Sequence, residues 1–151
     1  MGNFEIKNIT EDHAVYFSTG KITVGTGINL TNVIIVAQTG VEFKGGGGPT
    51  AVVSAPLPYP AVISGGNVTK SSGSFRIIGT VYAQGTVDIN PVDVTGVLIG
   101  QHVVIQGSSN FTDNHNTDPN YLKYYMFMPG FTYPPQLKIA AVVQGSWKEI
   151  Q

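Results

Sequence analysis

One stretch of the sequence reads Val81-Tyr82-Ala83-Gln84-Gly85-Thr86-Val87-Asp88-Ile89, and the same three-part cassette recurs about five times along the chain. An apolar triplet is followed by a polar or glycine-rich break and then by a triplet with apolar ends. The other copies begin at Tyr16, Ile35, Val62 and Val97. Because one short two-strand unit cannot bury its own apolar face, the repeat predicts stacked coils.

The spacing of the copies favours a β-solenoid. The closing triplets begin at residues 22, 41, 68, 87 and 103, so the intervals are 19, 27, 19 and 16 residues. These steps are too long for a hexapeptide left-handed β-helix and too irregular for an ankyrin or tetratricopeptide array. We therefore expect an all-β chain folded as a right-handed parallel β-solenoid of about five to six coils, with two long loop insertions. An antiparallel sandwich with short, regularly spaced strands is the alternative.

Strand pleating divides each closing triplet between the core and the surface. The middle residues are expected to point outward, and these are Thr23, Glu42, Thr69 and Asp88. The first and third residues are expected to face the core in the pairs Ile22/Val24, Val41/Phe43 and Val87/Ile89. Lys70 departs from this pattern because it stands where an apolar residue is expected.

Composition supports a single β domain spanning residues 1–151. The chain is 42% hydrophobic and 11% charged, which suffices to build one core. Nineteen glycines and nine prolines interrupt the apolar runs, and no long stretch has the helical period. The formal charge of −1 is spread without a basic patch, which argues against nucleic-acid binding. Because cysteine is absent, neither disulfides nor thiolate metal sites contribute.

The sequence shows no targeting segment. No apolar run reaches the roughly 20 residues needed to cross a bilayer, and the first residues lack the charged and apolar regions of a signal peptide. We expect either a cytosolic protein or a mature domain whose export segment has been removed.

The first insertion covers about residues 44–60. Its glycines permit unusual backbone conformations and its prolines remove ladder donors, so we expect it to loop out of the stack. The tetraglycine at 45–48 lacks the GxxxxGK[ST] pattern and the following helix of a phosphate-binding loop, and a surface loop is favoured.

The second insertion covers about residues 110–136 and begins with a polar stretch, residues 110–120. Its oxygen-bearing side chains suit calcium, but the central glycine and closing glutamate of an EF-hand loop are missing, so a structural turn is favoured. The aromatic run that follows supplies the candidate partner contacts, Tyr121, Tyr124, Tyr125, Phe127, Phe131 and Tyr133. These could stack on sugars or seat a protein partner. The preferred alternative is that they fold back and plug the open end or flank of the solenoid.

Catalytic patterns are not apparent in the sequence. The three histidines lie far apart without zinc-ligand spacing, and no GxSxG elbow or cysteine nucleophile is present. Glu42 and Asp88 share the outward cassette position, where a β-helix glycosidase could present paired acids. Solvated single carboxylates are the favoured explanation. We therefore expect no enzyme and assign no catalytic, cofactor-binding or metal-ligating residue.

Residues 74–89, followed by residues 94–107, resemble the C-terminal β-helical region of PilX-type pilus-assembly proteins. In that family a coil of the form G-x-(V/L)-Y-A-x-(x)-x-V-x-I precedes a coil of the form G-x-(I/L)-(I/V)-(A/G)-x-x-V-x-I. The closing Gly145-Ser146-Trp147-Lys148-Glu149 is similar to the family's P-G-S-W-(R/K)-E ending. The resemblance covers residues 60–150 well and the first coils loosely.

The resemblance implies a non-enzymatic structural or adhesive module that decorates, primes or caps a type IV pilus-like filament at the cell surface, outside the cell. Its partners would be pilin-like subunits or further copies of the chain, and a surface glycan is a further candidate. The family's apolar N-terminal helix, which would provide its membrane contact, is not in this sequence. Two alternatives remain: a bactofilin-like self-polymerising solenoid, and a carbohydrate-binding β-helix that uses the aromatic run or Glu42 and Asp88.

Overall fold

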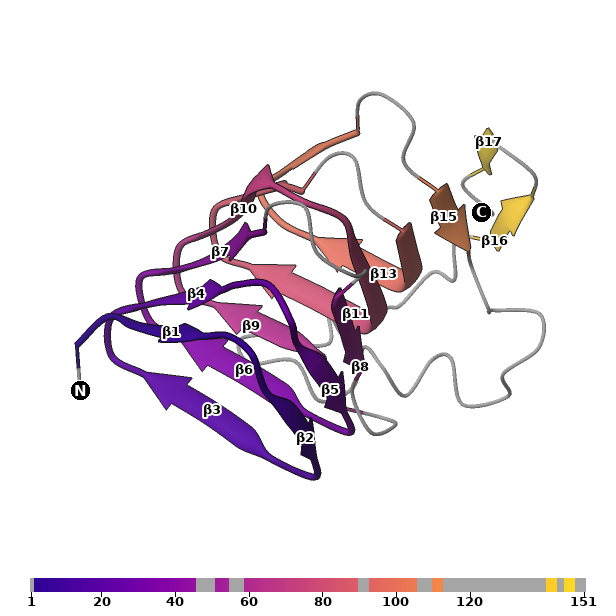
Figure 1. The fold of residues 1–151 in the computed structure, drawn as a ribbon. Helices are drawn as coiled ribbons and strands as arrows, with labels where there is room; N and C mark the ends of the chain where they lie inside the picture. Colours follow the sequence, from indigo (N-terminus) through magenta and orange to yellow (C-terminus); the bar gives the residue numbers. More distant parts are fainter. Residues whose placement is uncertain are drawn as a thin grey trace.

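The computed structural model is a parallel β-solenoid of about five turns (Figure 1). It describes residues 2–45, 51–54, 59–89, 93–105, 110–112, 141–143 and 146–148. Within these residues the chain forms strands and no helix, so none of them belongs to a helix able to span a membrane. All strand pairs of the solenoid are parallel, which confirms the predicted fold class and shows that the antiparallel sandwich is wrong.

Face 1 of the solenoid is a six-stranded ladder. Its strands, in stacking order, are β1 (Phe4–Ile6), β4 (Lys21–Val24), β7 (Gly40–Lys44), β10 (Asn67–Ser72), β12 (Thr86–Asp88) and β14 (His102–Val104). Along this ladder, equivalent positions are held by Phe4, Ile22, Val41, Val68, Val87 and Val103. The predicted coil starts at 22, 41, 68, 87 and 103 are therefore confirmed, and Phe4 adds one earlier coil.

Faces 2 and 3 belong to one nine-stranded sheet that bends at a corner of the solenoid. Face 2 contains β2 (Thr10–Asp12), β5 (Asn29–Thr31), β8 (Ala51–Ser54), β15 (Asn110–Thr112) and the first parts of β11 (Phe75–Ala83) and β13 (Asp93–Ile99). Face 3 contains β3 (Val15–Ser18), β6 (Ile34–Ala37), β9 (Val62–Ser64) and the last parts of β11 and β13.

The bend within β11 and β13 depends on two stacked glycines. Gly79 and Gly96 pair in the ladder and have φ angles of 128° and 144°, values that side chains other than hydrogen rarely allow. A Cβ atom on Gly96 would collide with the carbonyl oxygen of Gly79. These glycines let one continuous strand serve two faces.

The core fills the space enclosed by the three faces. The six predicted core residues Ile22, Val24, Val41, Phe43, Val87 and Ile89 are all buried. A complete coil has strand segments on three faces, however, whereas the cassette was interpreted as a two-strand unit. The additional strand places Leu30, Val53, Ile77 and Val94 in one buried column on face 2.

Both predicted insertions are shorter than expected. The segment 44–60 does not loop out as a whole, because it contains β8, whose Val53 is fully buried between Leu30 and Ile77 in the ladder. Residues 110–112 form β15 and pair with β13, so they continue the stack. β8 and β15 therefore belong to the face 2 ladder.

Lys70 pairs with Phe43, and the register shifts between Lys70 and Ser72, which confirms that the cassette departs from its pattern there. β16 (Ala141–Val143) and β17 (Ser146–Lys148) pair antiparallel, with Trp147 opposite Val142.

Candidate functional site

The predicted partner contacts cannot be placed on the fold. Tyr121, Tyr124, Tyr125, Phe127, Phe131 and Tyr133 lie outside the described residues, as do residues 113–120 of the predicted turn or calcium loop. The candidate functional sites that can be located therefore lie on the described strands of the solenoid.

Glu42 and Asp88 lie in one outward column of face 1. The ladder pairs Glu42 with Thr69 and Thr69 with Asp88, so the two carboxylates are two strands apart. At the usual spacing of about 4.8 Å between strands, their backbones are separated by about 10 Å. The predicted common position is confirmed, but Thr69 stands between the two acids.

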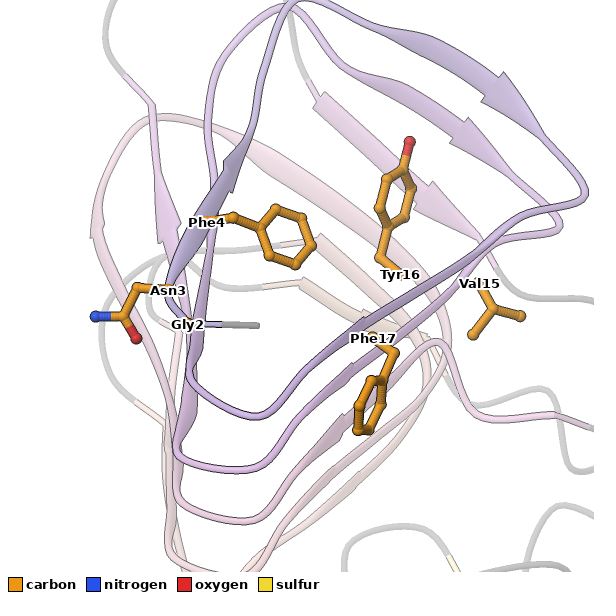
Figure 2. A pocket seen from close by; sticks show the side chains of 6 residues that line it. All are labelled: Gly2, Asn3, Phe4, Val15, Tyr16 and Phe17. Carbon is orange, nitrogen blue, oxygen red and sulfur yellow. The ribbon is translucent and has the colours of Figure 1, made fainter.

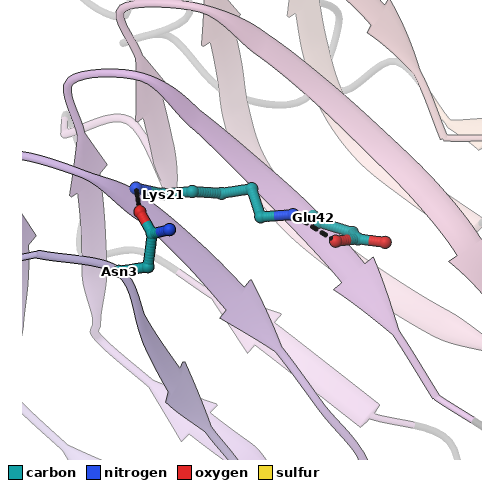
Figure 3. A network of polar contacts seen from close by, with 3 residues as sticks. All are labelled: Asn3, Lys21 and Glu42. Carbon is teal, nitrogen blue, oxygen red and sulfur yellow. Dashed lines mark hydrogen bonds and ion pairs between the residues drawn. The ribbon is translucent and has the colours of Figure 1, made fainter.

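Glu42 belongs to a polar network that ties three coils together (Figure 3). The Lys21 ammonium donates to the Glu42 carboxylate at 2.7 Å, and the Lys21 backbone N–H donates to Asn3 Oδ1, also at 2.7 Å. The hydrogen bond from Lys21, followed by one from Ser71, holds the pKa of Glu42 below its ordinary value. A general acid needs the opposite shift, so this geometry favours a structural role for the ionised carboxylate.

The two histidines that the structure describes, His13 and His102, show no metal-binding arrangement. His13 adopts a φ of 60° at a corner and contacts Asp12 at 2.9 Å, with both side chains exposed. His102 is the first residue of β14, pairs with Thr86 and is exposed. In the part of the chain that the structure describes, no group of three or more metal-ligating side chains occurs.

The N-terminal end of the solenoid contains an open hollow of about 620 Å³ (Figure 2). Its lining comes from β1, β3 and the chain before β1, namely Gly2, Asn3, Phe4, Val15, Tyr16 and Phe17. Phe4 and Tyr16 point into the end of the coil with ring centroids 6.3 Å apart, and both pack against the core. Val15 and Phe17 lie on the outer side of β3, with exposed fractions of 66% and 51%.

Glu11 and Tyr16 give this end a polar centre. Glu11 pairs with Leu30, so it takes a position that is apolar in the later coils. Burial, and to a smaller extent the Glu11 carboxylate, raises the pKa of the Tyr16 hydroxyl above its ordinary value. The hydroxyl stays protonated at neutral pH and is available as a hydrogen-bond donor.

The outer edges of the first coil have no neighbour among the described strands. β1, β2 and β3 each pair on one side, with β4, β5 and β6 respectively, and each ends its ladder. Backbone N–H and C=O groups along such edges are ready to pair with another chain. The end thus combines apolar side chains with three strand edges, which is the chemistry of strand addition.

The sequence contained a signal for this end that the cassette interpretation missed. Phe4-Glu5-Ile6 has the apolar ends of a closing triplet and begins 18 residues before Ile22, close to the interval of 19 that follows. In the given sequence this triplet lacks the apolar opening triplet that precedes the other closing triplets, so the search for the three-part cassette missed it.

The fold defines a class of protein, the parallel β-solenoid, and the described strands leave the outer side of its first coil unpaired. No protein-family model, curated protein or solved structure matches the chain.

Proposed function

We propose that the chain is a non-enzymatic structural module of a filament or related assembly at the cell surface, and that its N-terminal coil stacks on another protein subunit. The observation that carries the proposal is the open first coil, where three strand edges surround the Phe4 and Tyr16 rings. Stacked coils form a rigid platform from contacts between neighbouring repeats, which suits a structural role. The resemblance of residues 74–107 to PilX-type proteins supports a type IV pilus-like system and a pilin-like or identical subunit as partner.

The contact is tested by the concentration dependence of light scattering, compared between the wild-type chain and Phe4→Lys. Phe4 is only partly buried and lies at the end of the ladder, so a lysine there places a charge in the contact. We expect wild-type scattering to rise with concentration and with added partner, and Phe4→Lys to suppress the rise. Thr69→Lys on face 1 is the control and should behave as wild type. Equal scattering by both variants would contradict stacking through this coil.

A bactofilin-like polymer is the second candidate, because the same open coil also permits end-to-end growth of one chain type. Immunogold labelling of intact cells that produce the protein separates the two. Label on surface filaments supports the pilus-like system, whereas filaments seen inside opened cells, with none on the surface, support the polymer.

A further inference from the structure

Glu11 ends a ladder column that is otherwise apolar and buried. In face 2 it pairs with Leu30 of the next coil. The column continues with Val53, Ile77 and Val94. These four apolar residues are each 2% exposed or less, so pleating directs the Glu11 side chain toward the inner side of the sheet as well. Glu11 itself is half-buried, because no described strand lies beyond it.

The Glu11 carboxylate has no hydrogen bond or ion pair in the part of the chain that the structure describes. The basic residues of the first coil are Lys7 and His13, and both contact other acids. The Lys7 ammonium lies 2.9 Å from the Glu5 carboxylate. His13 lies 2.9 Å from Asp12. An inward carboxylate without a cation therefore lies at the end of the core.

The surroundings of Glu11 suit a cationic side chain. Its charge contributes to the raised pKa of the Tyr16 hydroxyl, and the Tyr16 and Phe4 rings lie 6.3 Å apart at the same end. Aromatic faces attract ammonium and guanidinium groups, and a carboxylate binds them more strongly. Residues 2–20 carry three carboxylates and one lysine, so the first coil as a whole is acidic. A subunit that covers Glu11 removes its water, and a cation then offsets that cost.

The far end of the solenoid offers no such cation. The face 2 column reaches Phe111 in β15. The described residues of the last coil, 102–105 and 110–112, contain neither lysine nor arginine. A second copy that continued the ladders in register would therefore place the Phe111 position over Glu11 and cover the carboxylate without a cation. Identical copies should stack only weakly for this reason.

We propose that the open first coil selects a different protein subunit, one whose contacting end presents a lysine or arginine to Glu11. The stacking itself rests on the proposed function, and this inference adds the chemistry of the partner. Glu11 then determines specificity, because it pairs with the base of a matching subunit and disfavours copies of its own chain. Inward-pointing charges restrict pairing at exposed strand edges in other β proteins.

The test uses copies of this chain as probes for the open first coil. The lysine probe carries Phe4→Lys, which blocks its own open coil, and Phe111→Lys, which adds a base to the Glu11 column at the far end. The reference probe carries Phe4→Lys alone. The labelled receptors are the wild-type chain, Glu11→Gln and Asp12→Asn. Asp12→Asn is the matched control because it removes the same charge from the outward, exposed side of β2.

Fluorescence-detected sedimentation velocity measures the affinity of each receptor for each probe, and circular dichroism establishes that each variant is folded. We expect the wild-type receptor to bind the lysine probe at least about tenfold more tightly than the reference probe. Asp12→Asn should keep this preference, and Glu11→Gln should lose it. Equal binding of the two probes by the wild-type receptor, or an equal loss of preference in Asp12→Asn, would overturn the inference.

Self-association of Glu11→Leu gives a second measurement, because leucine completes the apolar column. We expect this variant to associate with itself at least about tenfold more tightly than the wild-type chain, and equal self-association would overturn the inference. Failure of the proposed function has a different result, in which Phe4→Lys in the receptor leaves every association unchanged. If Phe4→Lys instead abolishes association while the Glu11 variants behave as wild type, stacking through the first coil stands and selection of a basic partner fails.

Discussion

Replacing Phe43 by alanine should destabilise the solenoid more than any surface change. Phe43 has no exposed surface, and its ring packs edge-on against Phe75 of the next coil with centroids 5.1 Å apart and planes at 68°. Loss of a buried phenyl ring costs about 3–5 kcal/mol in proteins, and edge-to-face ring pairs contribute about 0.5–1.5 kcal/mol of coupling beyond burial. A domain's total stability is about 5–15 kcal/mol, so Phe43→Ala removes a large fraction. For a chain of this length the melting temperature should fall by about 6–20 °C.

Urea unfolding followed by circular dichroism measures this loss, with the slope of the transition checked for a constant value. A double-mutant cycle of Phe43→Leu and Phe75→Leu isolates the ring pair. Thr23→Ala, an outward residue on face 1, is the control and should change stability by less than about 0.5 kcal/mol. A cost below about 1 kcal/mol for Phe43→Ala, or no coupling in the cycle, would refute the packing of the two neighbouring coils through these rings.

Three further changes test other parts of the structure. The pKa of Glu42 is lowered in the folded state, so its contribution to the free energy of unfolding is complete above the unfolded pKa and is lost as the pH falls through the folded pKa. Glu42→Gln should therefore cost about 0.2–1 kcal/mol at pH 7 and flatten the acid limb of a curve of stability against pH. An unchanged acid limb would contradict the network. Burial lowers the pKa of Lys70 in the folded state, so this residue should make the free energy of unfolding rise as the pH passes from the folded pKa to the unfolded pKa, and Lys70→Met should abolish that rise; an equal rise in Lys70→Met would contradict the burial of the ammonium. Gly96→Ala should cost about 1–3 kcal/mol because of its φ of 144°, measured against Gly2→Ala, which meets no atom within 4 Å; equal melting temperatures would argue against the bend.

Face 1 could be predicted from the sequence almost residue by residue. Its closing triplets have two inward apolar residues around one outward residue, and this alternation fixes both the strand and its register. Val41 and Phe43, with Glu42 between them, show the pattern most clearly. The intervals between triplets then equal the residues per coil, because the ladder pairs equivalent positions.

Face 2 was missed because each strand contributes too little apolar sequence. Asn29-Leu30-Thr31 carries a single inward residue between two polar ones, which resembles a turn when read alone. β8 lies between glycine-rich and proline-rich residues that dominate the local composition. Burial of Leu30 and Val53 comes from neighbouring coils, and this tertiary context is not visible in a short window.

The apolar outer column of face 3 was partly visible in the sequence. Opening triplets such as Ile35-Val36-Ala37 are apolar at all three positions, which implies that both sides of the strand lack charge. Only the ladder shows that Val36, Ile63 and Tyr82 stand in one outward line.

The corners of this solenoid have a consequence for how such a chain can vary. The coil that begins at Val41 is eight residues longer than the coil that begins at Ile22, yet Val41 still pairs with Val68 and Ile35 still pairs with Val62. The connections between strands can therefore differ in length from coil to coil without changing which strands pair. Foreign peptides inserted between β7 and β8 or between β8 and β9 should be displayed at fixed heights along a rigid rod. Because neighbouring strands lie about 4.8 Å apart, segments attached to different coils would be spaced along the solenoid axis in steps of this size.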